Sequence, residues 1–277
     1  AVGGELWGAS RVLVRRPRPA LHSPVQTRLR YATPFYPMST ISDRLSRLFD
    51  AERAVRTLHT ELSTEDRSAL VAALAEAEDE ALALPDSREA ELRLVRIAEL
   101  AGEAEGPAAV DLLLDVLGSE HPEARVVAGE VLEAVAFDRF KEVALGVERA
   151  LERLPAGSPA LPEIPYLLAE VAEPGCLKLL GKFLHHADPE AVAAAIEALV
   201  ELADPSAAPL LAPLVRDVRQ VQIDDEGEVG HVSIGALAEE AGELLAELEH
   251  HERRGNQGPP PPRQGGGGGG SNKKPRR

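Results

Sequence analysis

The sequence has few of the residues that usually anchor or cross-link a globular core. Aromatic residues make up 3 % of the 277 residues, and Cys176 is the only cysteine. One cysteine cannot form an internal disulfide, and the chain has neither an apolar run of about 18 residues nor a secretory signal. We therefore expect a soluble, cytoplasmic protein without a membrane span. Ala, Leu and Glu dominate the middle of the chain and β-branched runs are rare, so the composition predicts an all-α fold.

A helical unit recurs along the chain. Asp-Pro at residues 188–189 and 204–205 predicts two helix starts, because Asp accepts hydrogen bonds from free N–H groups and Pro fits the first helical position. Residues 107–136 and 174–203 share eleven identical residues of thirty at an offset of 67. The signatures "IAELA", "LEAVA", "LAEVA", "LVELA" and "LAELE" follow one another at intervals of 35, 36, 31 and 46 residues. Such periods are typical of stacked helical repeats, none of which buries its apolar face alone.

Periodicity and boundary signals predict eleven helices and one β-hairpin. We expect helices at 42–60, 64–84, 87–102, 107–118, 122–136, 138–153, 161–173, 175–186, 189–203, 205–219 and 235–249. Pro209 and Pro213 should bend the helix at 205–219, because proline lacks the N–H that a helix interior needs. Apolar and polar residues alternate on both sides of an acidic turn in residues 220–234, which predicts a β-hairpin inserted into the last repeat.

The two ends of the chain differ from its middle. Residues 1–37 are basic and show no periodicity, whereas Met38 begins a clean amphipathic pattern. We interpret 1–37 as a disordered leader or an over-extended gene start, and the alternative is an Arg-rich transit peptide. Residues 251–277 are rich in Pro, Gly and basic residues and are expected to be a disordered tail. Between the ends we expect capping helices at 38–84 and helical repeats at 85–250.

The repeats resemble a known family. A proline begins the first helix in "EPGCLKLLGKFL" and "DPSAAPLLAPLV", and an Asp-Pro turn is followed by Val-x-x-Ala-x-x-Ala-Leu in "DPEAVAAAIEALVEL". These motifs resemble HEAT repeats, in particular the short bacterial HEAT-like repeats of the phycobilin-lyase type. The resemblance implies a right-handed α-solenoid of helical hairpins, in which the second helices line a concave face. It does not imply a single function, because fold and activity are separable.

The charge of the repeats limits the possible partners. Residues 38–250 contain 17 basic and 44 acidic residues, a net charge of −27, whereas both ends are basic. Such a body repels nucleic acid, whose binding depends on neutralised phosphates. We therefore expect a protein partner that is basic. The tail residues 273–277 are the part of the chain that would suit an anionic partner.

The sequence does not contain the residues that several activities of HEAT-like proteins require. Proteins resembling deoxyhypusine hydroxylase need paired His-Glu motifs for two irons, but His251-Glu252 is the only such pair. DNA glycosylases of this fold need a basic groove. The acidic segment "DDEGE" at 224–228 does not have the ligand spacing of a calcium-binding EF-hand loop, and Cys176 aligns with Ala109 of the paired repeat as a small core residue. The sequence therefore indicates no catalytic, metal-binding or cofactor-binding residue.

Two acidic features are candidates for partner binding. One position of the repeat signature holds a glutamate in four units, and stacking would set these side chains in a row about 10 Å apart. The turn of the predicted hairpin is also acidic. The candidate residues are Glu99, Glu170, Glu201, Glu247, Asp224, Asp225, Glu226 and Glu228.

The sequence leaves three interpretations of these features. Acidic residues at these positions can simply keep a small solenoid soluble. The function we favour is a non-enzymatic scaffold or adaptor that binds a basic protein through the acidic concave face and the hairpin. The alternative is a lyase or assembly factor that acts on a cofactor-bearing client protein.

Overall fold

The computed structural model describes residues 40–225 and 228–256. The expected leader at 1–37, the start at Met38 and the turn residue Glu226 lie outside these ranges. So do residues 257–277, which include the basic segment 273–277. The described chain divides within α1 (Ile41–Ser63): residues up to Glu52 belong to one unit, and residues from Arg53 belong to a second.

The described part of the first unit is the beginning of α1. The helix starts with a mutual cap, in which the Thr40 N–H donates to Asp43 Oδ2 (2.9 Å) and the Asp43 N–H donates to Thr40 Oγ1 (3.1 Å). Such a pair satisfies two N–H groups that have no partner within the helix. The large apolar side chains of this segment are exposed: Ile41, Leu45, Leu48 and Phe49.

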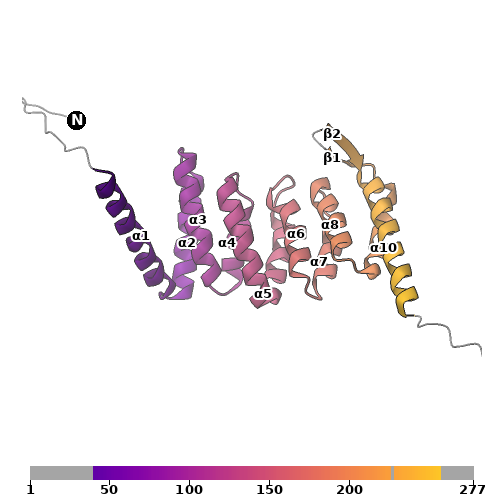
Figure 1. The fold of residues 1–277 in the computed structure, drawn as a ribbon, viewed down its shortest axis with the longest axis horizontal. Coiled ribbons are helices and arrows are strands. Elements are labelled where there is room, and N and C mark those ends of the chain that lie inside the picture. Colours follow the sequence, from indigo (N-terminus) through magenta and orange to yellow (C-terminus); the bar gives the residue numbers. More distant parts are fainter. Residues whose placement is uncertain (1–39, 226–227, 257–277) are drawn as a thin grey trace, which may run out of the picture. The chain divides into compact units, whose positions relative to one another are not determined.

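The second unit is a stack of helix pairs, followed by a hairpin and a last helix (Figure 1). Its elements are the end of α1, α2 (Arg67–Leu82), α3 (Ser87–Glu103), α4 (Pro107–Leu117), α5 (Pro122–Arg153), α6 (Ala160–Val171), α7 (Cys176–Phe183), α8 (Pro189–Glu201), η1 (Pro205–Ala207), α9 (Ala208–Leu211), η2 (Ala212–Arg216), β1 (Gln220–Asp225), β2 (Glu228–Ser233) and α10 (Ile234–Asn256). In each pair the second helix packs against the second helix of a neighbouring pair, as α6 does against α8 and α8 against α10. This arrangement confirms the helical solenoid with an inserted hairpin. No described helix is both long and apolar enough to cross a membrane.

The helix starts follow the signals in the sequence. Asp66, Asp86 and Asp188 are N-caps whose carboxylates accept hydrogen bonds from backbone N–H groups of the first turn. Proline occupies the first turn of α4, α5 and α8, where its missing N–H leaves no hydrogen bond unmade. One continuous core of Leu, Ile, Val and Ala runs from α2 to α10, and burying each such large side chain contributes roughly 1.5–3 kcal/mol.

The predicted break between the helices at 122–136 and 138–153 is a kink within α5. Arg139 has non-helical dihedral angles (φ −136°, ψ 46°) at this point. Its guanidinium donates to the backbone oxygens of Gly102 (3.2 Å) and Ala104 (3.1 Å), at the end of α3. The residue that interrupts α5 therefore also supplies partners to carbonyl groups that α3 cannot satisfy itself.

The prediction of one helix over 205–219 is wrong. The segment is divided into η1, α9 and η2 and is no longer helical after Arg216. Pro209 and Pro213 each remove a backbone donor within a short distance, so a continuous helix cannot form. At the other end, α10 continues to Asn256, so the helix passes the boundary that we expected at residue 250.

The predicted hairpin is confirmed as an antiparallel pair of β1 and β2, with Val221 opposite Val232. Val221 is buried, and the hairpin is fixed to the body at its base. There, the Arg219 guanidinium donates to the His186 carbonyl oxygen (2.8 Å) and to both Asp217 oxygens. The Gly235 N–H donates to the Asp217 carbonyl oxygen (2.9 Å), and a Cβ at residue 235 would lie 2.6 Å from a backbone oxygen. The base of the hairpin is therefore held by several hydrogen bonds, and the close backbone approach requires glycine at residue 235.

Candidate functional site: the acidic face of the second helices

The four glutamates predicted from the repeat signature each lie on a described helix. Glu99 lies on α3, Glu170 on α6, Glu201 on α8 and Glu247 on α10. Two of them lie near Tyr166 of α6: Glu170 lines the same groove as Tyr166, and the charge of Glu201 on α8 contributes to the raised pKa of Tyr166.

We use the name Tyr166 cluster for Tyr166 and the five glutamates that surround it: Glu133, Glu163, Glu170, Glu197 and Glu201. The Tyr166 hydroxyl donates to Glu197 Oε2 at 2.5 Å, which joins α6 to α8. Burial, followed by this hydrogen bond and the charges of nearby glutamates, raises the pKa of Tyr166. The phenol therefore stays neutral and acts as a hydrogen-bond donor to the Glu197 carboxylate.

A shallow groove of about 300 Å³ runs along one side of the cluster, between α5 and α6. Glu133, Glu163 and Glu170 supply its carboxylates, and Leu117 and Leu167 supply apolar surface. This combination suits a long basic side chain, whose apolar stem packs on leucines while its charged end meets a carboxylate.

The charges of the cluster are only partly neutralised. Glu163 forms an ion pair with Arg125 at 2.5 Å, and Arg125 Nε is buried without a hydrogen-bond partner. The other four glutamates lie on α5, α6 and α8: Glu133, Glu170, Glu197 and Glu201. Within the described ranges, none of them forms an ion pair with a Lys, Arg or His. Like charges on helices that pack against one another repel, so a cation bound here would relieve the repulsion.

The other predicted residues have different surroundings. Glu99 forms an ion pair with Arg96 of the same helix (2.7 Å) and lines a groove of mixed charge with Arg56, His59 and Glu103. Glu247 is exposed on α10 beside His250 and His251. Within the hairpin, Asp224 is paired in register with Val229, and Asp225 with Glu228.

The sequence analysis missed Tyr166, Glu197, Glu163 and Glu133. Two of them had a detectable signal, because Tyr166 precedes Glu170 by four residues and Glu197 precedes Glu201 by four residues. Residues four apart lie on one face of a helix. Glu133 and Glu163 join the cluster because of the way neighbouring helices stack. The repeat signature carries no information about this stacking.

The described residues offer little to nucleophilic or metal chemistry. Cys176 is buried at 1 % exposure, and burial raises the pKa of its thiol, which disfavours the reactive thiolate. This confirms the small core residue that the repeat alignment predicted. No group of three or more His, Cys, Asp or Glu side chains within 40–225 and 228–256 is arranged to hold a metal ion.

Residues 166–223 match the family of HEAT repeats. Two crystal structures of engineered proteins from the Northeast Structural Genomics Consortium are similar to the chain. The first is 21 % identical in sequence and has a TM-score of 0.30. The match covers 69 % of this chain and 88 % of the engineered chain. The second is 20 % identical, covers 71 % and 92 %, and has a TM-score of 0.31. No curated protein matches the chain.

The matched segment contains Tyr166, Glu170 and Glu201 and extends from α6 into β1. The preceding helices α4 and α5 also begin at prolines, Pro107 and Pro122, and α5 packs on α6 of the matched segment. Residues 166–223 therefore match HEAT repeats, and the helix pairs of the second unit stack as a helical solenoid.

Proposed function

We propose that the chain is a non-enzymatic adaptor that binds a basic protein through the acidic face of its second helices. The observation that carries the proposal is the Tyr166 cluster, in which four glutamates have no basic partner among the described residues. HEAT-repeat solenoids are typically scaffolds for protein interactions, and this cluster is the place where a basic partner would gain most.

Electrostatic complementarity defines what the partner must provide. Each exposed ion pair contributes about 0.2–1 kcal/mol, so four carboxylates favour several Lys or Arg side chains rather than one. Such pairs mainly raise the association rate and exclude acidic competitors. Apolar anchors must supply the remaining affinity, and Leu117 and Leu167 in the groove are suitable surfaces.

The hairpin extends the proposed interface. The Gln222 N–H donates to Glu190 Oε1 at 3.4 Å, so β1 is joined to α8, the helix that carries Glu197 and Glu201. The predicted acidic residues Asp224 and Asp225 belong to β1 and Glu228 belongs to β2, whereas Glu226 lies outside the described residues. We propose that they contact the same partner, because Arg219 and Gly235 hold the base of the hairpin against the body.

Affinity capture from a native lysate tests this function. The full chain serves as bait, and the bound proteins are eluted by raising the salt concentration. A second bait replaces residues 222–231 by a short Gly-Ser turn, which keeps the buried Val221 and the anchor at Arg219. We expect a basic protein that is released by salt and that the second bait fails to retain, with unchanged helicity by circular dichroism. A partner that ignores both salt and the hairpin would contradict the proposal.

Nothing in the described ranges favours the alternative role of a lyase or assembly factor. A chromophore or cofactor that copurifies with the captured client would favour it, so the same eluate distinguishes the two functions.

A further inference from the structure

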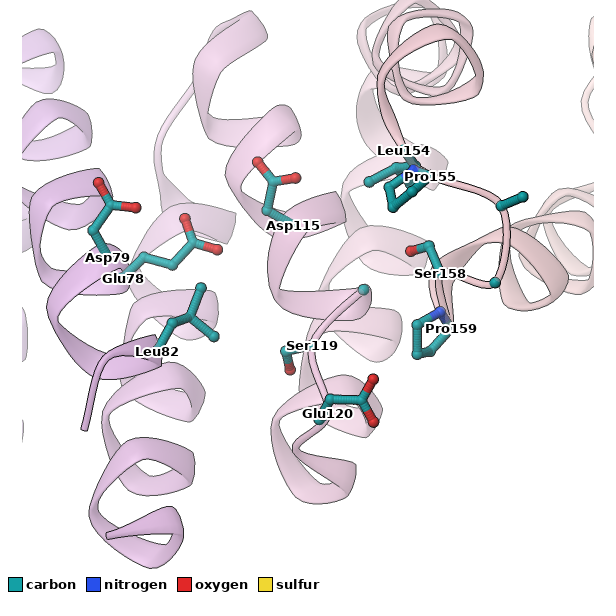
Figure 2. Close-up of a pocket in the computed structure, with 13 residues that line it drawn as sticks. Glu78, Asp79, Leu82, Asp115, Ser119, Glu120, Leu154, Pro155, Ser158 and Pro159 are labelled. Carbon is teal, nitrogen blue, oxygen red and sulfur yellow. The ribbon is translucent and has the colours of Figure 1, made fainter. Parts of the chain in front are cut away.

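A second acidic site lies away from the Tyr166 cluster, at the ends of the helices. It is an open pocket of about 530 Å³ between α2 and α4, bordered by the loops 118–120 and 154–159. Its lining includes the carboxylates of Glu78, Asp79, Asp115 and Glu120, and the hydroxyls of Ser119 and Ser158. Figure 2 shows Glu78 extending from α2 toward Asp115 on α4, with Ser158 on the opposite wall. We call it the Glu78 pocket.

Glu78 is the unusual member of this group. It continues the apolar stripe of α2 after Leu70 and Leu74, so the packing of the helix forces it inward, and it is only 8 % exposed. A buried carboxylate normally has hydrogen-bond or ionic partners, because burying an unpaired charge is costly. In the part of the chain that the structure describes, no hydrogen bond or ion pair reaches the Glu78 carboxylate.

The neighbouring charges do not compensate Glu78. The Arg153 guanidinium forms an ion pair with Asp115 and also donates to the Asp111 carbonyl oxygen (3.5 Å). Burial, then the charges of Asp115 and Asp79, raises the pKa of Glu78 to about 7, although Arg153 lowers it. The pocket thus holds a carboxylate that lacks a donor and that a bound cation would stabilise.

The walls of the pocket are already in place. The Gly157 N–H donates to Asp188 Oδ2 at 2.6 Å, which fixes the loop 154–159 to the start of α8. Ser158 is 8 % exposed and its hydroxyl has no hydrogen-bond partner within the described ranges, so it is a second polar group at the pocket without a partner. A ligand that donates hydrogen bonds would supply the donor that the Glu78 carboxylate lacks, and Ser158 offers a further oxygen in the same lining.

We propose that the Glu78 pocket binds a primary alkylammonium group, either at the end of a lysine side chain or on a free amine. An ammonium has three donors on a compact charge, which suits carboxylates and a hydroxyl on separate walls. The carboxylates are not grouped as metal ligands, and an alkyl stem would contact Leu82, Leu154 and Pro155 of the lining. This site is separate from the Tyr166 cluster and does not depend on the adaptor function.

Binding of small probes to the full chain tests the proposal. The probes are Nα-acetyl-lysine methylamide, n-butylamine and, as an uncharged control, Nα-acetyl-norleucine methylamide. Binding is followed by the NMR amide signals of Gly118 and Gly157, which line the pocket. We expect saturable shifts of these signals with both amines, with a dissociation constant of about 1 mM or lower, and none with the norleucine compound. Tighter binding of the lysine compound would identify a protein side chain as the source, and equal binding would identify a free amine.

Two variants and the pH dependence provide the controls. Glu78→Gln keeps the shape of the side chain and should weaken amine binding by at least about tenfold. Glu80→Gln removes a charge from the same helix outside the pocket and should leave binding unchanged. Glu78 faces Asp79, Asp115 and Arg153 and titrates near neutrality, so affinity should be about tenfold lower at pH 6 than at pH 8. Absence of saturable shifts, or equal binding by wild type and Glu78→Gln, would overturn the proposal.

Discussion

The buried carboxylate of Asp188 should contribute more to stability than any other N-cap with the same sequence motif. Its side chain is 4 % exposed and accepts two backbone hydrogen bonds, from Glu190 within α8 (2.9 Å) and from Gly157 in the loop 154–159 (2.6 Å). Loss of the cap costs about 1 kcal/mol. Loss of a hydrogen bond to a charged group adds roughly 1.5–3 kcal/mol. Asp188→Ala should therefore lower the free energy of unfolding by about 2–4 kcal/mol.

Asp204 is a matched control, because it also precedes a proline and caps the following turn. Its carboxylate accepts only from the Ser206 N–H (2.9 Å) and has no long-range partner among the described residues. Asp204→Ala should cost only about 0.5–1 kcal/mol. Urea unfolding followed by far-ultraviolet circular dichroism gives both values from the shift in midpoint. Equal losses for the two variants would refute the argument, because the bond to Gly157 would then contribute nothing.

Two further perturbations follow from the packing and charge of the body. A Cβ at Gly146 would lie 2.4 Å from Val110 Cγ1, so Gly146→Ala should lower the free energy of unfolding by about 1–3 kcal/mol. A Cβ at Gly242 would meet no atom within 4 Å, so Gly242→Ala should raise the free energy of unfolding by up to about 1 kcal/mol. Thermal unfolding of both variants checks this, and equal shifts would contradict it. The pKa of Glu78 is raised on folding from 4.5 to about 7, so the folded state binds the proton more tightly and stability falls as pH rises through this range. Glu78→Gln should therefore raise the free energy of unfolding by roughly 1–3 kcal/mol at pH 8 and by little at pH 5. Urea titrations at both pH values measure this difference, and an effect that does not change with pH would contradict it.

Local signals in the sequence predicted most of the helical architecture. Asp188-Pro189 begins a helix as expected, because capping depends only on the residues of the first turn. The segment 205–219 shows where such signals conflict. An Asp-Pro start and an apolar pattern favoured a helix, but two internal prolines removed the donors that a helix interior requires.

The candidate site was less predictable, because it depends on contacts between repeats. Glu99 and Glu170 occupy the same position in the signature, yet Glu99 has Arg96 as a partner and Glu170 has none among the described residues. The Glu78 pocket also had a partial signal, since Glu78 interrupts the apolar stripe of α2. Only the folded chain shows that Asp115 and the loop 154–159 meet it there.

The most direct test of the adaptor function is the affinity of the captured partner for two triple variants. One carries Glu→Gln substitutions at Glu170, Glu197 and Glu201 of the Tyr166 cluster. The other carries the same change at Glu76, Glu80 and Glu152, which are exposed on other helices. The two variants have the same net charge, so long-range electrostatics change equally.

Isothermal titration calorimetry at physiological salt gives both dissociation constants. We predict about tenfold weaker binding for the cluster variant and a change of less than about twofold for the control. Equal weakening of both variants would show that only net charge matters, and it would contradict a docking surface on the second helices.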